Sequence, residues 1–325
     1  MRPILAVVFV SVVTSACGAP GAASAPVDRP AARGRRAQLF EFHVGKWVNL
    51  HQLLYARTSR WGPERAESEP EDAAWLAALD HYRTAFDHRN FLALLADPDL
   101  APINRTLSQI GDGPLQGLDP VLTGHLERAG ASYDRTWPAD RGRNRDWIAA
   151  LEPALARHGD ALAGALAAAY GVPWPDRPIR VDVSIHAGPV GAYTVLDPTH
   201  VTITSSSPQY TGDAALEMIF HEASHALVDP LVEKLTAECA RQGKPVPPRL
   251  WHALLFYATG EVVRRRLGPS YVPYADKNGL WARGMADHER PIKQHWPQYL
   301  DGAIDMDTAL ARLVASLPAG APPPP

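Results

Sequence analysis

The sequence predicts an α+β fold that is mostly helical, with one small mixed or antiparallel sheet directly before a helix that carries two histidines. Three observations support this prediction. Apolar residues repeat with a helical period through most of the first half, three short segments rich in β-branched residues follow, and helical periodicity then returns. The 325 residues suffice for one large domain or two of ordinary size.

The composition is that of a globular protein rather than a fibrous or disordered one, since 46% of the residues are hydrophobic and 21% are charged. The formal net charge is -3 and no dense basic stripe occurs. Nucleic acid is therefore not expected as a partner. The basic run "RGRR" at Arg33–Arg36 is interpreted as solvated charge in a linker.

The first seventeen residues predict a secretory signal, and hence export. Arg2 precedes an apolar run over residues 4–13 that is too short to span a bilayer, and small residues follow it. "TSAC" resembles the lipobox of bacterial lipoproteins, although Thr14 replaces the usual leucine. The resemblance implies lipidation of Cys17, which would anchor the protein in a bacterial envelope membrane. The alternative is ordinary cleavage near the same place and release into the periplasm. If Cys17 carries lipid, the second cysteine, Cys239, has no disulfide partner.

Residues 18–36 are rich in Ala, Pro and Gly and predict a flexible linker, and residues 317–325 predict a disordered tail. Residues 37–175 form a predicted N-terminal helical region. Within it, helices are expected over 38–54, 71–86 and 144–170 and in "NFLALLA", whereas 97–120 is broken by Pro and Gly and is expected to be mostly loop.

Residues 176–316 form the second predicted region. Strands are expected in "IRVDVSIH", "GAYTV" and "HVTITSS". A helix then begins near Thr211 or Asp213 and is expected to end at Asp229-Pro230. Further helices are predicted over 231–241 and 250–267, followed by a few short ones.

The helix after the strands contains His221-Glu222-Ala223-Ser224-His225, the pattern H-E-x-x-H. Residues four apart lie on one helix face, so His221 and His225 can bind one Zn²⁺ at about 2.0–2.1 Å each. Glu222 lies about 100° round the helix and can act as a general base toward a metal-bound water. The apolar neighbours predict burial, which makes unpaired polar groups costly. The alternative is a pair of core histidines bonded to carbonyls, with Glu222 in a salt bridge.

A catalytic zinc site needs a third protein ligand and an open fourth position. Glu261, on the predicted helix 250–267, is the first candidate, and Gly260 beside it predicts a close approach of two helices. The alternative for Glu261 is a salt bridge to Arg265. His252 is the competing ligand, and its nine-residue separation from Glu261 places the two on opposite helix faces. Glu217 could orient His221, or could be an exposed first-turn glutamate.

These residues resemble the zincin metallopeptidases, in particular the gluzincin branch, and the phrases "ALEMIFHEASHAL" and "LWHALLFYATGEVVRR" are similar to those of uncharacterised secreted bacterial proteins. The resemblance implies a zincin-like fold with His221, His225 and Glu261 as ligands and Glu222 as general base. It also implies an antiparallel edge strand beside the metal, supplied by "GAYTV" or "HVTITSS", and an oxyanion donor.

Tyr271 and Tyr274 are the candidates for this oxyanion donor, with His252 and His288 as alternatives. Arg265 stands where gluzincins often have an aspartate that supports the first histidine. The sequence therefore predicts an exported zinc-dependent hydrolase, most simply a peptidase that acts on a peptide or protein substrate. One alternative is an envelope binding or assembly protein that has lost catalysis, and another is a purely structural zinc.

Overall fold

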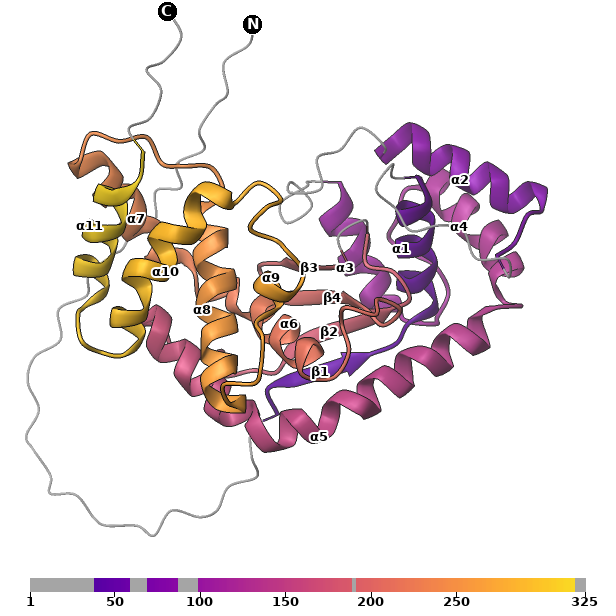
Figure 1. The fold of residues 1–325 in the computed structure, drawn as a ribbon. Helices are drawn as coiled ribbons and strands as arrows, with labels where there is room; N and C mark the ends of the chain where they lie inside the picture. Colours follow the sequence, from indigo (N-terminus) through magenta and orange to yellow (C-terminus); the bar gives the residue numbers. More distant parts are fainter. Residues whose placement is uncertain (1–37, 59–68, 87–98, 189–190, 319–325) are drawn as a thin grey trace, which may run out of the picture. The chain divides into compact units, whose positions relative to one another are not determined.

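The structure is a computed structural model, and it describes residues 38–58, 69–86, 99–188 and 191–318 (Figure 1). In these residues the chain forms four strands and eleven helices, in the order β1 (Phe40–His43), α1 (Lys46–Thr58), α2 (Ala73–Phe86), α3 (Leu100–Ile110), α4 (Pro120–Tyr133), α5 (Trp137–Tyr170), β2 (Ile179–Ser184), β3 (Ala192–Val195), β4 (His200–Thr204), α6 (Asp213–Ser224), α7 (Asp229–Arg241), α8 (Leu250–Leu267), α9 (Tyr274–Lys277), α10 (Ala286–Leu300) and α11 (Met306–Ser316). The predicted mostly helical α+β class is confirmed. The signal, the linker, Cys17, "NFLALLA" and nearly all of the tail lie outside the described residues.

The four strands form one mixed sheet in the order β1-β2-β4-β3. β1, β2 and β4 are parallel neighbours, and β3 pairs antiparallel with β4 at one edge. The helix predicted to begin at residue 38 is wrong for its first turns, because Phe40–His43 pairs with β2 as β1 and the helix begins at Lys46. Over four residues an alternating apolar pattern is hard to distinguish from a helical stripe, and strand pairing decides the outcome here.

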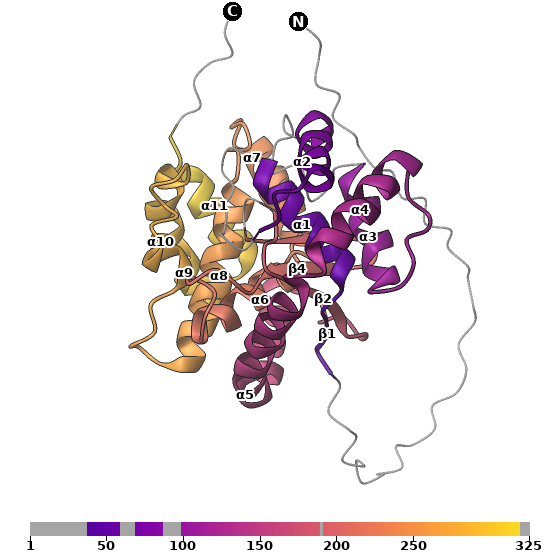
Figure 2. The same ribbon diagram turned by 90° about the vertical axis from the view of Figure 1, so that its right-hand side faces the viewer.

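The two faces of the sheet differ sharply in polarity. Val181, Val183, Val201 and Ile203 face a large hydrophobic core that also contains side chains of α5 and α6. Helices α1 and α3 lie beside the sheet (Figure 2), and the alternate residues of β2 and β4 contact polar groups of these helices, as Thr202 does with Asn104 and Arg180 with the Ser108 carbonyl. This alternation follows from the two-residue period of a strand. One face of the sheet thus carries an apolar core, and the other carries a buried polar layer.

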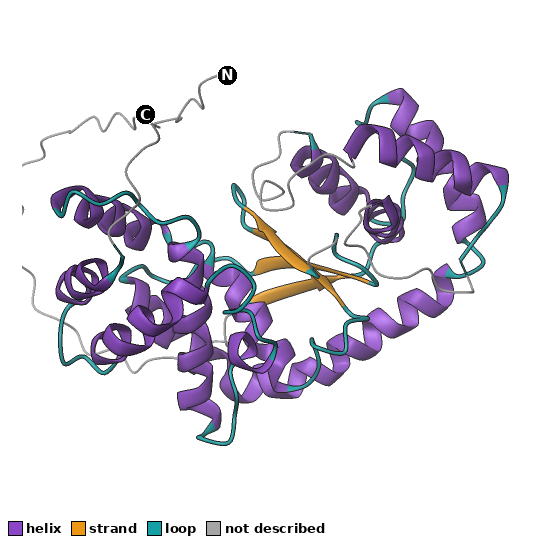
Figure 3. Ribbon diagram, turned by 45° about the horizontal axis from the view of Figure 1, so that its top comes forward, coloured by secondary structure: helices purple, strands orange, loops and turns teal. Residues whose placement is uncertain are grey.

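The sheet lies between two groups of helices (Figure 3). Helices α1–α4 enclose one hydrophobic core, and α5–α11 enclose the other together with the apolar sheet face. α5 contributes Trp137 to the first core and side chains from Trp147 to Tyr170 to the second. Both β1 and α5 precede residue 176, yet both pack with the elements that follow it.

Two other predicted boundaries differ from the structure. The segment 97–120, expected to be mostly loop, contains α3, whose Leu100, Asn104 and Leu107 are buried against α1 and the sheet. Tertiary packing overrides the weak local signal there. Helix α6 ends at Ser224 rather than at Asp229, and a separate helix begins at Asp229. Among the described helices, none combines the length and the apolar character that crossing a membrane requires.

Candidate metal centre

Helix α6 carries the H-E-x-x-H pattern through the centre of the larger core. Every side chain from Ala214 to Ser224 is buried, including His221 and Glu222, which are 1% and 4% exposed. His225 follows the last residue of α6, and its backbone (φ -57°, ψ -27°) remains right-handed helical. The one-turn spacing of His221 and His225 is therefore kept although the regular helix ends between them.

His252 of α8 completes a group of three histidines with His221 and His225. One ring nitrogen from each lies within 4.8 Å of those of the other two. The ring centroids are 5.4 Å apart for His221 and His225, 5.3 Å for His221 and His252, and 5.4 Å for His225 and His252. His221 and His225 are buried, whereas His252 is half-buried. The three imidazoles thus form a nearly equilateral triangle that is closest to solvent at His252.

Helices α6 and α8 pack antiparallel, with contacts that repeat every four residues on both. His252 meets His225, the ring of Phe256 stacks on His221 at 3.8 Å, and Gly260 lies against Glu217. A Cβ at Gly260 would lie 3.0 Å from Glu217 Oε1 and 2.8 Å from Pro273 Cβ. The predicted close approach at Gly260 is confirmed, and the shared four-residue spacing is that of ridges packed into grooves.

Glu261 does not join the histidines. Its two carboxylate oxygens accept hydrogen bonds from Arg264 and Arg265 on the same helix, at 2.7–2.8 Å. Nine residues at about 100° each turn the helix by a half revolution relative to His252, so only one of the two residues can face α6. The structure brings His252 to the pair in place of Glu261, and the third candidate ligand is corrected accordingly.

The donor set fits a zinc ion. His221 Nδ1 is buried and has no hydrogen-bond partner among the described residues, which is rare for a buried polar atom. Burial lowers the pKa of all three histidines, to about 3 for His225, about 4 for His252 and well below the usual value for His221. Neutral imidazoles are the form that binds metal, and three of them form the ligand set of some catalytic zinc sites.

Glu222 is held by the edge strand β3. Thr194 Oγ1 lies 2.8 Å from both Glu222 Oε2 and the Glu222 carbonyl oxygen, so the hydroxyl can donate to either. Burial raises the pKa of Glu222 to about 7, against the opposing effect of the Thr194 hydrogen bond. An antiparallel edge strand from "GAYTV" therefore lies directly beside the motif helix, in the place that the resemblance implies for it.

Glu217 matches neither expectation from the sequence, because it is buried and its partners do not include His221. Its Oε2 accepts a 2.6 Å hydrogen bond from the Tyr271 hydroxyl and a 2.9 Å bond from the Tyr274 backbone N–H. Burial raises the pKa of Glu217 to about 7. Both Glu217 Oε1 and His221 Nδ1 lack hydrogen-bond partners in the described part of the chain, so the predicted bond between the two residues is not formed. Glu217 instead attaches the segment before α9 to α6.

The hydroxyls of Tyr271 and Tyr274 both have partners outside the histidine group. Tyr271 donates to Glu217, and the Tyr274 hydroxyl lies 3.0 Å from Gln209 Oε1. The ring of Tyr274 is near Phe256, at 6.4 Å between centroids. His288, one of the two histidine alternatives, bonds the Pro248 carbonyl oxygen at 3.0 Å and serves a structural role there.

Tyr210, which no sequence pattern predicts as a site residue, lies beside the edge strand β3 that holds Glu222. Its ring packs on Gly191 at the start of β3, where a Cβ would be 3.2 Å from the hydroxyl. Its pKa is raised well above the usual value by burial, then by Tyr274, with which it shares a hydrogen bond, and by the Glu222 charge. Trp147 Nε1 fixes the Tyr210 backbone through a 2.7 Å bond to its carbonyl. Tyr210 sits in "PQYTGD", which has no periodicity that could have predicted this position.

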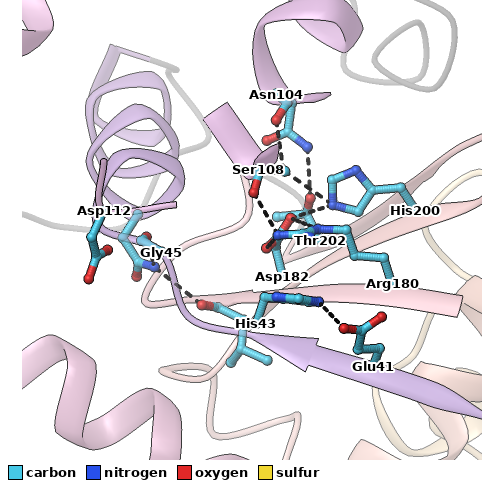
Figure 4. A network of polar contacts seen from close by, with 12 residues as sticks. Glu41, His43, Gly45, Asn104, Ser108, Asp112, Arg180, Asp182, His200 and Thr202 are labelled. Atoms are coloured by element: carbon cyan, nitrogen blue, oxygen red, sulfur yellow. Dashed lines mark hydrogen bonds and ion pairs between the residues drawn. The ribbon is translucent and has the colours of Figure 1, made fainter. Parts of the chain in front are cut away.

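A second polar cluster lies on the other face of the sheet, where His200 contacts both Asp182 and Ser108 (Figure 4). These are the residue types of a nucleophilic triad, but both contacts are made to the same nitrogen, Nε2, at 2.5 Å and 3.4 Å. A triad needs the carboxylate and the hydroxyl on different ring nitrogens. Arg180 joins Asp182 to the Ser108 carbonyl, so the cluster attaches α3 to the sheet.

No family model, no curated protein and no solved structure matches this chain. Its function is therefore inferred from the geometry and chemistry of the histidine group and its neighbours.

Proposed function

We propose that this protein is a zinc-dependent hydrolase that cleaves peptide or amide bonds. The observation that carries the proposal is the triangle of three neutral histidines beside a buried glutamate. Three protein ligands leave one position of a tetrahedral zinc ion open, as catalytic rather than structural sites do. Zinc bound there would act as a Lewis acid and lower the pKa of a water molecule at that open position to about 7.

Glu222 is the general base in this proposal. Thr194 holds Oε2, so Oε1 is the oxygen that would receive a proton and return it to the leaving amine. A pKa near 7 suits both transfers at neutral pH, because the group then gains and loses a proton with little cost. The positive charge of zinc would lower this raised pKa and keep Glu222 ready to accept a proton.

The edge strand β3 is the proposed docking position for an extended peptide. It is the last strand in the sheet order, so its outer backbone groups are not used by another strand of the described sheet. A substrate could add there through main-chain hydrogen bonds. Tyr210, which packs on the start of β3 and shares a hydrogen bond with Tyr274, is the proposed hydroxyl donor to the oxyanion that forms at the scissile carbonyl, and it would exchange its bond to Tyr274 for one to the oxyanion.

The deciding experiment replaces Glu222 with glutamine. We expect Glu222→Gln to bind zinc as the wild type does, measured by elemental analysis, and to lose hydrolysis of a quenched fluorescent peptide library. Glu233→Gln removes an exposed carboxylate of α7 and should change neither readout. Hydrolysis that survives in Glu222→Gln would exclude this mechanism.

A second candidate is a zinc-binding envelope protein without catalysis. It is favoured by one observation: the hydroxyls of Tyr271 and Tyr274, the donors expected from the sequence, are both engaged elsewhere. Zinc retained by the wild type together with no cleavage of any library peptide would support this candidate over the hydrolase.

Export and lipid anchoring at Cys17 belong to the proposal as well, from the signal pattern in residues 1–17. Replacement Cys17→Ser should move the protein from the detergent phase to the aqueous phase in a Triton X-114 partition. A protein that partitions into the aqueous phase with Cys17 intact would exclude the anchor.

A further inference from the structure

Two exposed arginines, Arg249 and Arg283, lie near the end of α8 that carries His252. Arg249 immediately precedes α8 and stands three residues before His252 in the chain, so both residues belong to the same end of this helix. His252 is the one histidine of the three that is not fully buried. Among the three histidines, His252 is therefore the one nearest to solvent.

The position of the Arg249 side chain is specified by the backbone. Arg249 has φ +65°, a left-handed conformation that is unfavourable for a non-glycine residue. Its Nη1 rests on Gly284, where an added Cβ would lie only 2.8 Å away. Gly284 is itself left-handed, with φ +94°. A strained residue beside a site is a reason to look for function there.

Arg283 adjoins the same glycine in the chain, so both arginines belong to one part of the surface. Arg283 Nη2 donates to the Asn278 carbonyl oxygen at 2.8 Å. Its positive charge opposes the rise in the pKa of Tyr210 and of Tyr274, whereas the charge of Arg249 adds to the burial that lowers the pKa of His252. The charge of Arg249 thus affects the candidate ligand His252, and the charge of Arg283 affects Tyr210, the proposed oxyanion donor.

Neither guanidinium is neutralised within the described residues, since neither has a carboxylate within 4 Å. Arg264 and Arg265, at the far end of α8, differ in this respect, because both pair with Glu261. A zinc ion in the site would make this surface still more positive, so it favours an anionic ligand.

We propose that Arg249 and Arg283 form a carboxylate-binding subsite beside the histidine group. Guanidinium forks match the planar carboxylate geometry and can bind it through two parallel hydrogen bonds. The inference rests on the proposed hydrolase for its substrate class, a peptide that presents a carboxylate next to the bond to be cut. The carboxylate comes either from the free end of the peptide or from an Asp or Glu side chain.

Binding of three fluorescein-labelled peptides tests this subsite, by fluorescence anisotropy with zinc-loaded Glu222→Gln protein, which prevents turnover. The peptides share one neutral sequence. The first has a free carboxyl end, the second has an amidated end, and the third has an amidated end and one internal Glu. We expect the first or the third to bind about tenfold more tightly than the second, as two partly solvated ion pairs permit. The stronger of the two identifies the source of the carboxylate.

Removal of the arginines should abolish the difference. Arg249→Gln and Arg283→Gln are each expected to reduce the preference by about threefold and the double variant to eliminate it, with a weaker effect at high salt. Arg145→Gln, an exposed arginine of α5, is the matched loss of charge and should leave the preference intact. Equal binding of all three peptides, or a preference that survives in the double variant, would overturn the subsite.

The same measurements separate this inference from the proposed function. If the wild type cleaves peptides equally well with and without a carboxylate, the result supports the proposed hydrolase and contradicts the carboxylate subsite. If the protein binds no zinc yet prefers carboxylate peptides in its metal-free form, the result supports the subsite and contradicts the proposed hydrolase.

Discussion

At the scale of single residues, His252 and Glu261 make opposite predictions for zinc binding. His252→Ala removes one of three clustered imidazoles, so zinc affinity should fall by more than the roughly 10–100-fold that loss of an outer-shell partner costs. Glu261→Gln should leave zinc affinity unchanged, because that carboxylate is bound to Arg264 and Arg265. Competition with a chromophoric chelator measures both values. Equal losses in the two variants would contradict the three-histidine site.

Burial of the three histidines also predicts how zinc binding depends on pH. Their pKa values are lowered, to about 3 for His225, about 4 for His252 and well below the usual value for His221, so protons do not compete for them above about pH 5. Zinc affinity should therefore be nearly constant between about pH 7.5 and 5.5. Three exposed histidines with ordinary pKa values would instead lose about 1,000-fold per pH unit below about 6.5. A fall of that size, measured by the same competition, would contradict the buried neutral site.

At the scale of elements, the contact between α6 and α8 at Gly260 sets the distance between the histidines on the two helices. A Cβ from Gly260→Ala would overlap with Pro273 and press on Glu217, so we expect a loss of about 1–3 kcal/mol in unfolding free energy and weaker zinc binding. Gly142→Ala is the matched control within α5. No described atom lies within 4 Å of its added Cβ, and alanine favours a helix by up to about 1 kcal/mol over glycine.

Chemical denaturation and zinc titration of the two variants test the role of this packing. If Gly260→Ala were as stable as Gly142→Ala and kept full zinc affinity, the close approach of the two helices would not matter for the site.

The elements differ in how far the sequence alone could predict them. α8 is predicted at its observed bounds because its periodicity is long and Gly268 follows it, and the three strands after α5 are predicted because β-branched residues alternate there. β1 and α3 could not be predicted in the same way. Each is short and has no independent stability, and each is defined by what it packs on: β2 for β1, and α1 with the polar sheet face for α3.

The candidate metal centre also contains residues that the sequence could predict and residues that it could not. His221, Glu222 and His225 are readable because their spacing lies within one helix, whereas the choice of His252 over Glu261 depends on which face of α8 turns toward α6. Both residues satisfy the spacing argument equally. Only the packing of two helices that are separate in sequence decides between them, and Tyr210 likewise reaches the site through its loop.

At the scale of the whole molecule, the buried ionisable groups predict that the metal-free protein loses stability as the pH falls below neutral. Burial raises the pKa of Glu217 and Glu222 to about 7, and it lowers the pKa of histidines, most strongly for the five residues His51, His186, His221, His225 and His252. Below about pH 6.5 the unfolded chain takes up protons on the five histidines that the folded chain does not, which destabilises the fold as the pH falls.

The two glutamates act in the opposite direction. Their folded pKa exceeds the unfolded value of about 4.5, so their contribution is present at low pH and is lost as the pH rises through about 7. Five groups outweigh two between about pH 5 and 6.5. We therefore expect the melting temperature, measured by calorimetry with a chelator present, to fall as the pH is lowered through this range. A melting temperature that rises over the same range would show that the histidines are not buried as neutral groups.

The parallel pairing of β1 with β2 gives the first helical group a topological role. Parallel neighbours cannot be joined by a hairpin and need a crossover connection, and here that connection consists of α1 through α5. These helices are thus inserted between two adjacent strands of the sheet that supports the histidine helix. A truncation that began the chain at residue 176 would leave β2 without its parallel neighbour on one side and would expose the polar face of the sheet to water.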